Sequence, residues 1–61
     1  MKVKVIYEDN TEEILDSVEE LGIVGISRIG KDDLRIIKDV GIRFYDGDEV
    51  RLKNVVRIVE A

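Results

Sequence analysis

The sequence predicts an all-β fold: a small, partly open barrel or roll of five to six short antiparallel strands built from repeated hairpins. Two observations predict it. The chain holds nine valines and nine isoleucines against four leucines and one alanine, and β-branched residues favour strands because they lose rotamer freedom in helices. Segments rich in these residues also alternate with short turn-forming segments, as in chains built from hairpins.

The length allows one small domain, residues 1–61, with a limited core. A chain of this size buries only about 60% of the surface that its unfolded form exposes. Cysteine and histidine are absent, so neither disulfides nor the usual zinc ligands can reinforce the core. Charged residues make up 39% of the chain, and this composition is typical of proteins from thermophiles. Stability must therefore come from packing, ion pairs or self-association.

The first hairpin is predicted around "EDNTEE", residues 8–13. Asn10 readily takes a positive φ angle, which a tight hairpin loop requires. A three-residue loop over residues 8–10 gives these cross-strand partners: Tyr7 with Thr11, Val5 with Glu13, and Val3 with Leu15. The apolar positions then fall on one face with a period of two, as in a half-buried strand pair.

The same pattern recurs 37 residues later, around "YDGDEV", residues 45–50. Aligning residues 9–21 with residues 46–58 needs no gap, and Asn10 matches Gly47, the other residue that favours positive φ. The identical pairs are Asp9/Asp46, Glu12/Glu49, Leu15/Leu52 and Val18/Val55. The equivalent loop pairs Phe44 with Asp48, Ile42 with Val50, and Val40 with Leu52. Two equivalent hairpins are therefore predicted.

A third hairpin is predicted between the two copies, where "IVGISRI" and "LRIIK" flank "GKDD". The whole chain is then expected to hold six strands, near residues 2–8, 11–16, 18–29, 34–44, 48–53 and 55–60. Gly22, Gly25 and Gly41 are expected at bends or bulges in the longer strands. The strand number and chain length are similar to those of SH3-like and Sm-like rolls.

An α+β fold is the alternative, with one helix at residues 11–21. Asn10 would be its N-cap and Glu13 its capping-box partner. One apolar stripe would run along it, made of Ile14, Leu15, Val18 and Leu21. Gly22 would follow at the C′ position. The abundance of β-branched residues favours the strand interpretation.

No catalytic, cofactor or metal site is expected. The hydroxyl groups lack a histidine or cysteine to assist them, and nucleophilic catalysis needs an activating base. The carboxylates cluster at predicted turns, where burial cannot tune their pKa values. "DGDE" at residues 46–49 lacks the spacing of a calcium loop, and the glycines form no nucleotide-binding motif. The sequence therefore predicts a non-enzymatic protein without a cofactor.

Nucleic-acid binding is the second functional hypothesis. Arg28, Lys31 and Arg35 gather at the central hairpin, although Asp32 and Asp33 lie beside them and the net charge is −4. The segment "ISRIGKDDLRIIKDVGIRFYDGDEVRL" also resembles the AbrB/MazE swapped-hairpin DNA-binding proteins, which carry a "G-I-x-x-G-D-x-V" segment. Here "GIRFYDGDEV" has two extra residues before "GD", and the proline typical of that family is missing. The resemblance implies an antitoxin or regulator that binds DNA.

Protein binding is the first functional hypothesis, with a second copy of the chain as one partner. The last strand, "NVVRIVEA", carries apolar residues on both faces, so its second face needs a covering surface. We expect a homodimer whose seam includes Val55, Val56, Ile58 and Val59. The acidic residues 8–20 would approach Arg51, Lys53 or Arg57 of the other subunit. Without a secretory or membrane-spanning segment, a cytoplasmic location is expected, with no membrane partner.

Overall fold

The computed structural model of the chain describes residues 1–61 and contains five antiparallel strands and no helix. The strands are β1 (Val3–Tyr7), β2 (Glu12–Leu15), β3 (Val18–Ile29), β4 (Ile36–Phe44) and β5 (Glu49–Glu60). They form one open sheet in the order β2-β1-β5-β4-β3. The predicted all-β fold, a small partly open roll, is confirmed.

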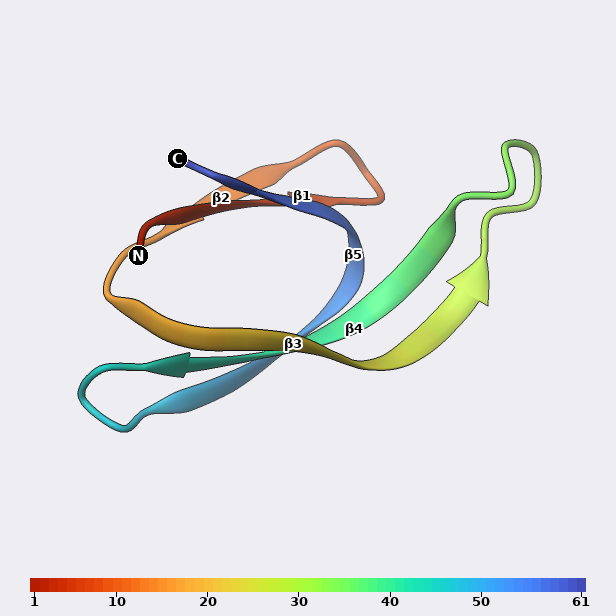
Figure 1. The fold of residues 1–61 in the computed structure, drawn as a ribbon. Coiled ribbons are helices and arrows are strands. Elements are labelled where there is room, and N and C mark those ends of the chain that lie inside the picture. The colour runs from red at the N-terminus through yellow and green to blue at the C-terminus, as the bar shows by residue number, and fades with distance from the viewer.

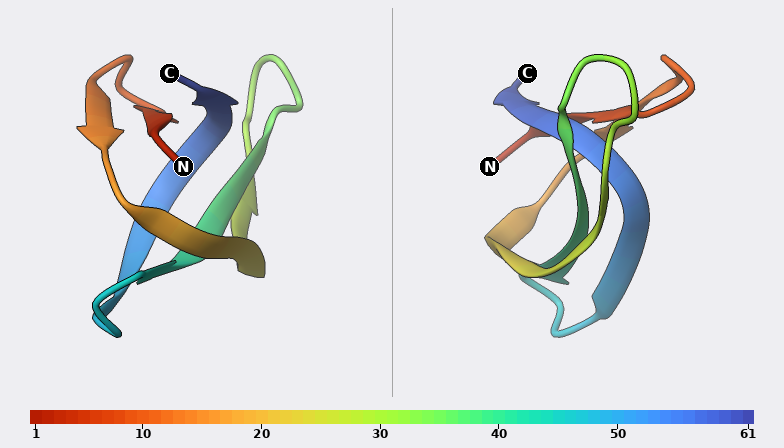
Figure 2. Two further views of the ribbon diagram at one scale, coloured as in Figure 1. Left: turned by 60° about the vertical axis from the view of Figure 1, so that its left-hand side comes forward. Right: turned by 90° about the vertical axis from the view of Figure 1, so that its right-hand side faces the viewer.

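A sharp bend in β5 folds this sheet into two layers (Figures 1 and 2). The bend lies at Asn54, whose φ angle is 61°. Before the bend β5 pairs with β4, and after it β5 pairs with β1. One layer therefore consists of β2, β1 and the end of β5, and the other consists of β3, β4 and the start of β5. Hydrogen bonds between Met1 and Val18 join the layers at the opposite side.

The helix considered for residues 11–21 is wrong. These residues form β2, a bend at Ser17 and the start of β3. Their apolar spacing fits a helical stripe, but the backbone of β2 pairs with β1, and Val18 pairs with Phe44 of β4. Sheet pairing satisfies backbone groups along the segment and buries Val18 completely, so tertiary packing overrides the local helix signals.

Two strand boundaries also differ from the prediction. The segments 48–53 and 55–60 belong to one strand, because the bend at Asn54 occurs within β5 and pairing continues on both sides of it. The fourth strand begins at Ile36, since Leu34 has a φ angle of 58° and still belongs to the turn. Gly25 adjoins a bulge as expected, whereas Gly22 and Gly41 lie directly opposite each other in regular register.

The two predicted hairpins are confirmed as equivalent structures. The Tyr7 N–H donates to the Thr11 carbonyl at 2.9 Å, and the Phe44 N–H donates to the Asp48 carbonyl at 2.8 Å. Asn10 has a φ angle of 70° at the position where Gly47 has 93°. The strand registers are those expected: Val3 with Leu15, Val5 with Glu13, Val40 with Leu52 and Ile42 with Val50.

The repetition extends over residues 1–24 and 38–61, beyond the hairpins that the sequence indicates. Val5 pairs with Ile58 of β5, and the equivalent Ile42 pairs with Leu21 of β3. The crossing contacts are also matched: the Glu8 N–H donates to the Asn54 carbonyl at 2.9 Å, as the Tyr45 N–H does to the Ser17 carbonyl at 3.0 Å. The molecule therefore consists of two halves related by a pseudo-two-fold axis.

The core lies between the layers and follows the same symmetry. Its six buried residues form three equivalent pairs: Val3/Val40, Val5/Ile42 and Val18/Val55. The partly buried residues around it also form three pairs: Tyr7/Phe44, Leu15/Leu52 and Leu21/Ile58. Each half thus supplies the surface that covers the other, and the chain closes its core without a second molecule.

Residues 25–37 have no counterpart in this symmetry and form what we call the arm. The arm is the outer end of the β3–β4 hairpin, and it extends away from the two layers at the right of Figure 1. Its tip is closed by a hydrogen bond from the Gly30 N–H to the Arg35 carbonyl at 2.6 Å. Ile37 at its base is buried, and Arg28 forms an ion pair with Glu8 of the first hairpin.

Candidate interaction surface

Large apolar side chains are exposed along the β3–β4 hairpin. Four isoleucines form what we call the apolar stripe: Ile23, Ile26, Ile29 and Ile36, with exposed fractions of 64%, 63%, 60% and 47%. Leu34 at the tip of the arm is 75% exposed. Single exposed apolar residues are common on soluble proteins, whereas a row of them is a candidate interaction site.

The apolar stripe lies on one face of the sheet, and this face is the one that carries the core. Ile23 is the cross-strand partner of Val40, Ile26 that of Lys38, and Ile29 that of Ile36. Cross-strand partners share a face, and alternate residues of β4 point the same way. The core face of β3 and β4 therefore continues outward along the arm, beyond the second layer that covers Val40.

The outer edge of β3 is also unpaired, because β3 is the last strand of the sheet. Edge strands are normally protected by charged side chains, prolines, bulges or covering segments. The other edge strand, β2, is short and begins with Glu12 and Glu13. By contrast, residues 21–27 of β3 carry no charge and no proline, although bulges interrupt their pairing with β4. Bulges are therefore the only one of these devices along residues 21–27.

Three of the five glycines are favoured by close contacts or by conformation within the chain. Gly47 has a positive φ angle, a Cβ atom at Gly30 would lie 2.6 Å from Asp33 Oδ1, and one at Gly41 would lie 3.1 Å from Val24 Cγ1. Gly22 and Gly25 differ. A Cβ atom at Gly22 would meet nothing within 4 Å, and one at Gly25 would meet only Asp39 Oδ2 at 3.9 Å.

Glycine within a strand weakens it and often marks a place where another backbone approaches closely. Both unexplained glycines lie in β3, the edge strand. Nothing inside the chain needs the space beside them. They leave the backbone of this edge open to a second molecule.

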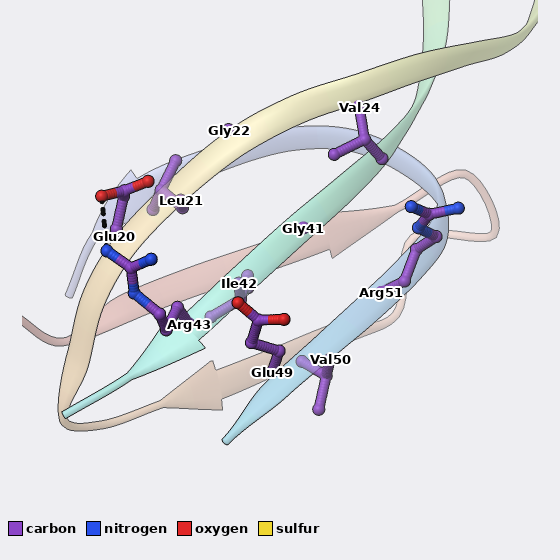
Figure 3. Close-up of a pocket in the computed structure, with 10 residues that line it drawn as sticks. All are labelled: Glu20, Leu21, Gly22, Val24, Gly41, Ile42, Arg43, Glu49, Val50 and Arg51. Carbon is purple, nitrogen blue, oxygen red and sulfur yellow. Dashed lines mark hydrogen bonds and ion pairs between the residues drawn. The ribbon is translucent and has the colours of Figure 1, made fainter. Parts of the chain in front are cut away.

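A hollow of about 370 Å³ lies on the opposite face of the same strands, over Gly22 and Gly41 (Figure 3). Val24 and Arg51 stand at one end of it. At the other end Arg43 binds Glu20, with Nη2 2.8 Å from Oε2. The equivalent positions in the other half hold Lys4 and Val59, so the hollow is peculiar to this half. It presents an open groove beside the β3 edge, lined by mixed charge.

The three residues predicted to contact nucleic acid do lie on the arm, but two of them are engaged there. Arg28 forms an ion pair with Glu8, and Arg35 forms one with Asp33. The Arg35 N–H also donates to the Asp33 carboxylate, and this hydrogen bond is the main reason why the pKa of Asp33 is lowered. Lys31 alone has no ion-pair partner. A basic surface suited to a phosphate backbone is not assembled.

The residues predicted as the self-association seam are divided between two environments. Val55 is buried in the core, and Ile58 packs against it. Val56 and Val59 are half-buried. The other half of the same chain covers one face of β5, and this accounts for part of the apolar pattern on its two faces. Residues 56–60 pair with β1 on one side and have no strand on the other, so a seam at this edge stays a prediction.

The acidic residues 8–20 find basic partners within the chain. Besides the pair between Glu8 and Arg28, Lys4 Nζ lies 3.8 Å from Glu12 Oε1. Arg43 Nη2 lies 3.7 Å from Glu19 Oε1 as well as binding Glu20. These internal pairs account for part of the acidic patch that was expected to face a second subunit.

The remaining polar groups serve the hairpins. The hydroxyl of Tyr7 donates to Glu13 Oε1 at 2.7 Å, and burial together with this carboxylate raises the pKa of Tyr7 to about 12. Hydrogen bonds from the side chain and backbone of Thr11 lower the pKa of Asp9. No group of three or more carboxylates is placed to hold a metal ion. These interactions fix the geometry of the first hairpin.

The apolar stripe was not identified from the sequence. Its signal was present in "IVGISRI", which places isoleucines at intervals of three rather than two. Because the bulges after Ile23 and Ile26 each insert one residue, these isoleucines share one face despite their odd spacing. Regular alternation would have divided them between the two faces.

Comparison with known proteins adds nothing to this geometry: no family model matches the chain, and no curated protein or solved structure matches it either. The chain also has no helix of the length and hydrophobicity needed to cross a membrane.

Proposed function

We propose that this chain is a non-enzymatic interaction module that binds protein through the apolar stripe and the adjoining edge of β3. The observation that carries the proposal is the uncovered core face of the β3–β4 hairpin. Four isoleucines, each about half exposed or more, lie there in one row. The chain has only seven fully buried apolar residues, so four isoleucines left exposed on one face are a large amount of uncovered apolar surface for its size.

The features of this surface fit a polypeptide partner. An unpaired strand edge offers backbone N–H and C=O groups, and a second strand can add to it by main-chain hydrogen bonds. Apolar side chains beside the edge add buried area and select the partner. Nucleic acid is a poorer fit, because the arginines of the arm are paired with carboxylates and no aromatic residue lies on the arm.

Site-specific photo-cross-linking tests this proposal. Photoreactive benzoylphenylalanine is placed at Ile26, in the apolar stripe, and separately at Ile14, which is 49% exposed on the other edge strand. Each purified protein is irradiated alone and in an extract of the cells that naturally make it. Adducts are identified, and their cross-linked residues mapped, by mass spectrometry.

We expect one defined polypeptide adduct from position 26, removed by adding Ile29→Lys, and no matching adduct from position 14. An adduct with a second copy of the chain and an adduct with a different polypeptide would each support protein binding. Adducts of equal yield from the two positions, or none from position 26, would overturn the proposal. A nucleic-acid adduct from position 26 would also overturn it.

A further inference from the structure

We infer that the partner is a second copy of the chain, which pairs its β3 edge antiparallel with this one about a two-fold axis between Val24 and Gly25. This inference rests on the proposed function and names its partner. The result is a continuous sheet across two molecules, formed by the arm side of each. The two-fold axis makes the contact isologous, so one surface serves both copies.

The charges of β3 are self-complementary in this arrangement. Glu19 and Glu20 lie at the start of the strand and Arg28 lies near its end, with no charge between them. Antiparallel pairing brings the acidic start of each strand beside the basic end of the other. Glu20 and Arg28 are already paired within the chain, with Arg43 and Glu8, so their charges add to the specificity of the contact more than to its strength. Parallel pairing would place acid against acid.

The side chains of the middle segment also match. About this axis Ile23 of one copy lies opposite Ile26 of the other, so these two members of each apolar stripe meet on one face of the joint sheet, while Ile29 lies opposite Glu20. On the other face Val24 lies opposite Gly25. A Cβ atom at Gly25 would meet only Asp39 Oδ2 at 3.9 Å, which leaves room for the partner's Val24, and Gly22 keeps the approach free of side chains. Close approach of the second strand thus explains Gly22 and Gly25, which contacts within one chain do not explain.

The other free edges are less suitable. β2 offers four residues, two of them glutamates. The first part of β5 carries Glu49, Arg51 and Lys53, and its last part carries Arg57 and Glu60. Charges interrupt every stretch of these edges, whereas residues 21–27 form an uncharged run of seven. Two bulges, between Ile23 and Gly25 and between Ile26 and Arg28, interrupt this run, which keeps the contact short and limits growth into larger aggregates.

Single-cysteine cross-linking tests the geometry directly, because the chain has no cysteine of its own. Val24→Cys, which lies beside the axis, is compared under mild oxidation with Val59→Cys on the end of β5 and Ile14→Cys on β2. A disulfide requires Cα atoms within about 7 Å of each other. We expect a covalent dimer from Val24→Cys at tens of micromolar and little from the other two variants. Preferential dimerisation of Val59→Cys, or none of Val24→Cys, would overturn the inference.

Light scattering with sedimentation equilibrium on the unmodified chain and on Ile26→Lys provides the second measurement. Lysine at an edge opposes strand addition, and the lost apolar contact occurs twice in a symmetric pair. We expect Ile26→Lys to raise the dimer dissociation constant at least about tenfold. The control Ile14→Lys should leave it unchanged.

If the chain is monomeric at all concentrations, the inference that the partner is a second copy is overturned. The proposed function would then be decided by the photo-cross-linking from position 26: an adduct with a different polypeptide would uphold it. If that adduct were absent as well, both ideas would fail together.

Discussion

At the scale of single residues, the fold depends on a few positions with a left-handed backbone. Asn10 and Gly47 close equivalent hairpin loops, and Ser17 and Asn54 bend the chain at equivalent points, with φ angles of 58° and 61°. Asparagine and glycine tolerate this region better than other residues. The loops were predictable because asparagine and glycine are the residue types typical of such turns. The bends were not, because serine and asparagine after a strand also suit an ordinary turn.

Substitutions at the two loops should show the same requirement. Asn10→Gly should leave the free energy of unfolding nearly unchanged, because glycine adopts the φ angle of 70° without strain. Gly47→Val should lower it by more than about 1 kcal/mol, since a β-branched residue resists the φ angle of 93° found there. Urea unfolding measures both values. Equal tolerance of valine and glycine at position 47 would contradict the assigned turn.

Tyr7 should give stability a dependence on alkaline pH. Its pKa is raised to about 12 by burial and by Glu13, above the ordinary value of 10.0 in the unfolded chain. The stabilising effect of the neutral phenol is complete below pH 10 and is lost as the pH rises toward 12. Unfolding measured from pH 9 to pH 12 should show this decline. Tyr7→Phe should remove the part of the slope that this residue causes, and an unaltered slope would contradict the assignment.

The glycines of the β3–β4 pair should respond in opposite ways although they face each other. Gly22→Val should raise the stability of the monomer by about 0.5–1 kcal/mol, because the added side chain meets open space and favours the strand. Gly41→Val should lower it by about 1 kcal/mol or more through crowding against Val24. Thermal unfolding at low concentration, where association is absent, separates these outcomes. A loss at position 22 would show that the glycine has a purpose within the chain.

At the scale of elements, the hairpins could be predicted and the bent strand could not. Loop residues and alternating apolar positions determined the registers of β1 with β2 and of β4 with β5. The end of β5 was expected as a separate strand, since a single sequence does not show that one strand serves two layers. Helix signals at residues 11–21 remained plausible because the apolar stripe of a helix and a bent pair of strands use similar spacing.

Equivalent core positions in the two halves should contribute equally to the free energy of unfolding. Val18 and Val55 are both buried, with exposed fractions of 0% and 1%, and both follow a bend with positive φ. Val18→Ala and Val55→Ala should each lower the free energy of unfolding by about 2–3 kcal/mol, from lost burial and the cavity that remains. Val50→Ala, at a site 40% exposed, should cost much less. Chemical denaturation of the three variants measures these losses of stability. If the losses at positions 18 and 55 differ by more than about half of the larger one, the pseudo-two-fold core is contradicted.

At the scale of the whole molecule, two similar halves enclose one core and leave the arm outside it. The sequence indicated the duplication over residues 9–21 and 46–58. Its full extent became visible only in the pairing of β1 with β5 and of β3 with β4, where partners are distant in sequence. The exposure of Ile26 and Ile29 likewise depends on how far the second layer reaches, which no local pattern encodes.

The central claim is that one chain closes its own core and that the edge of β3 is where it binds. Amide hydrogen exchange followed by NMR at low and at high protein concentration tests this most directly. Core amides such as those of Val5 and Ile42 should already be protected in dilute solution, because the core closes within one chain. Amides in residues 21–28 that do not bond to β4 should exchange rapidly in dilute solution and slowly in concentrated solution. Core amides that exchange rapidly in dilute solution, or protection that grows with concentration along residues 56–60 and not along residues 21–28, would contradict the claim.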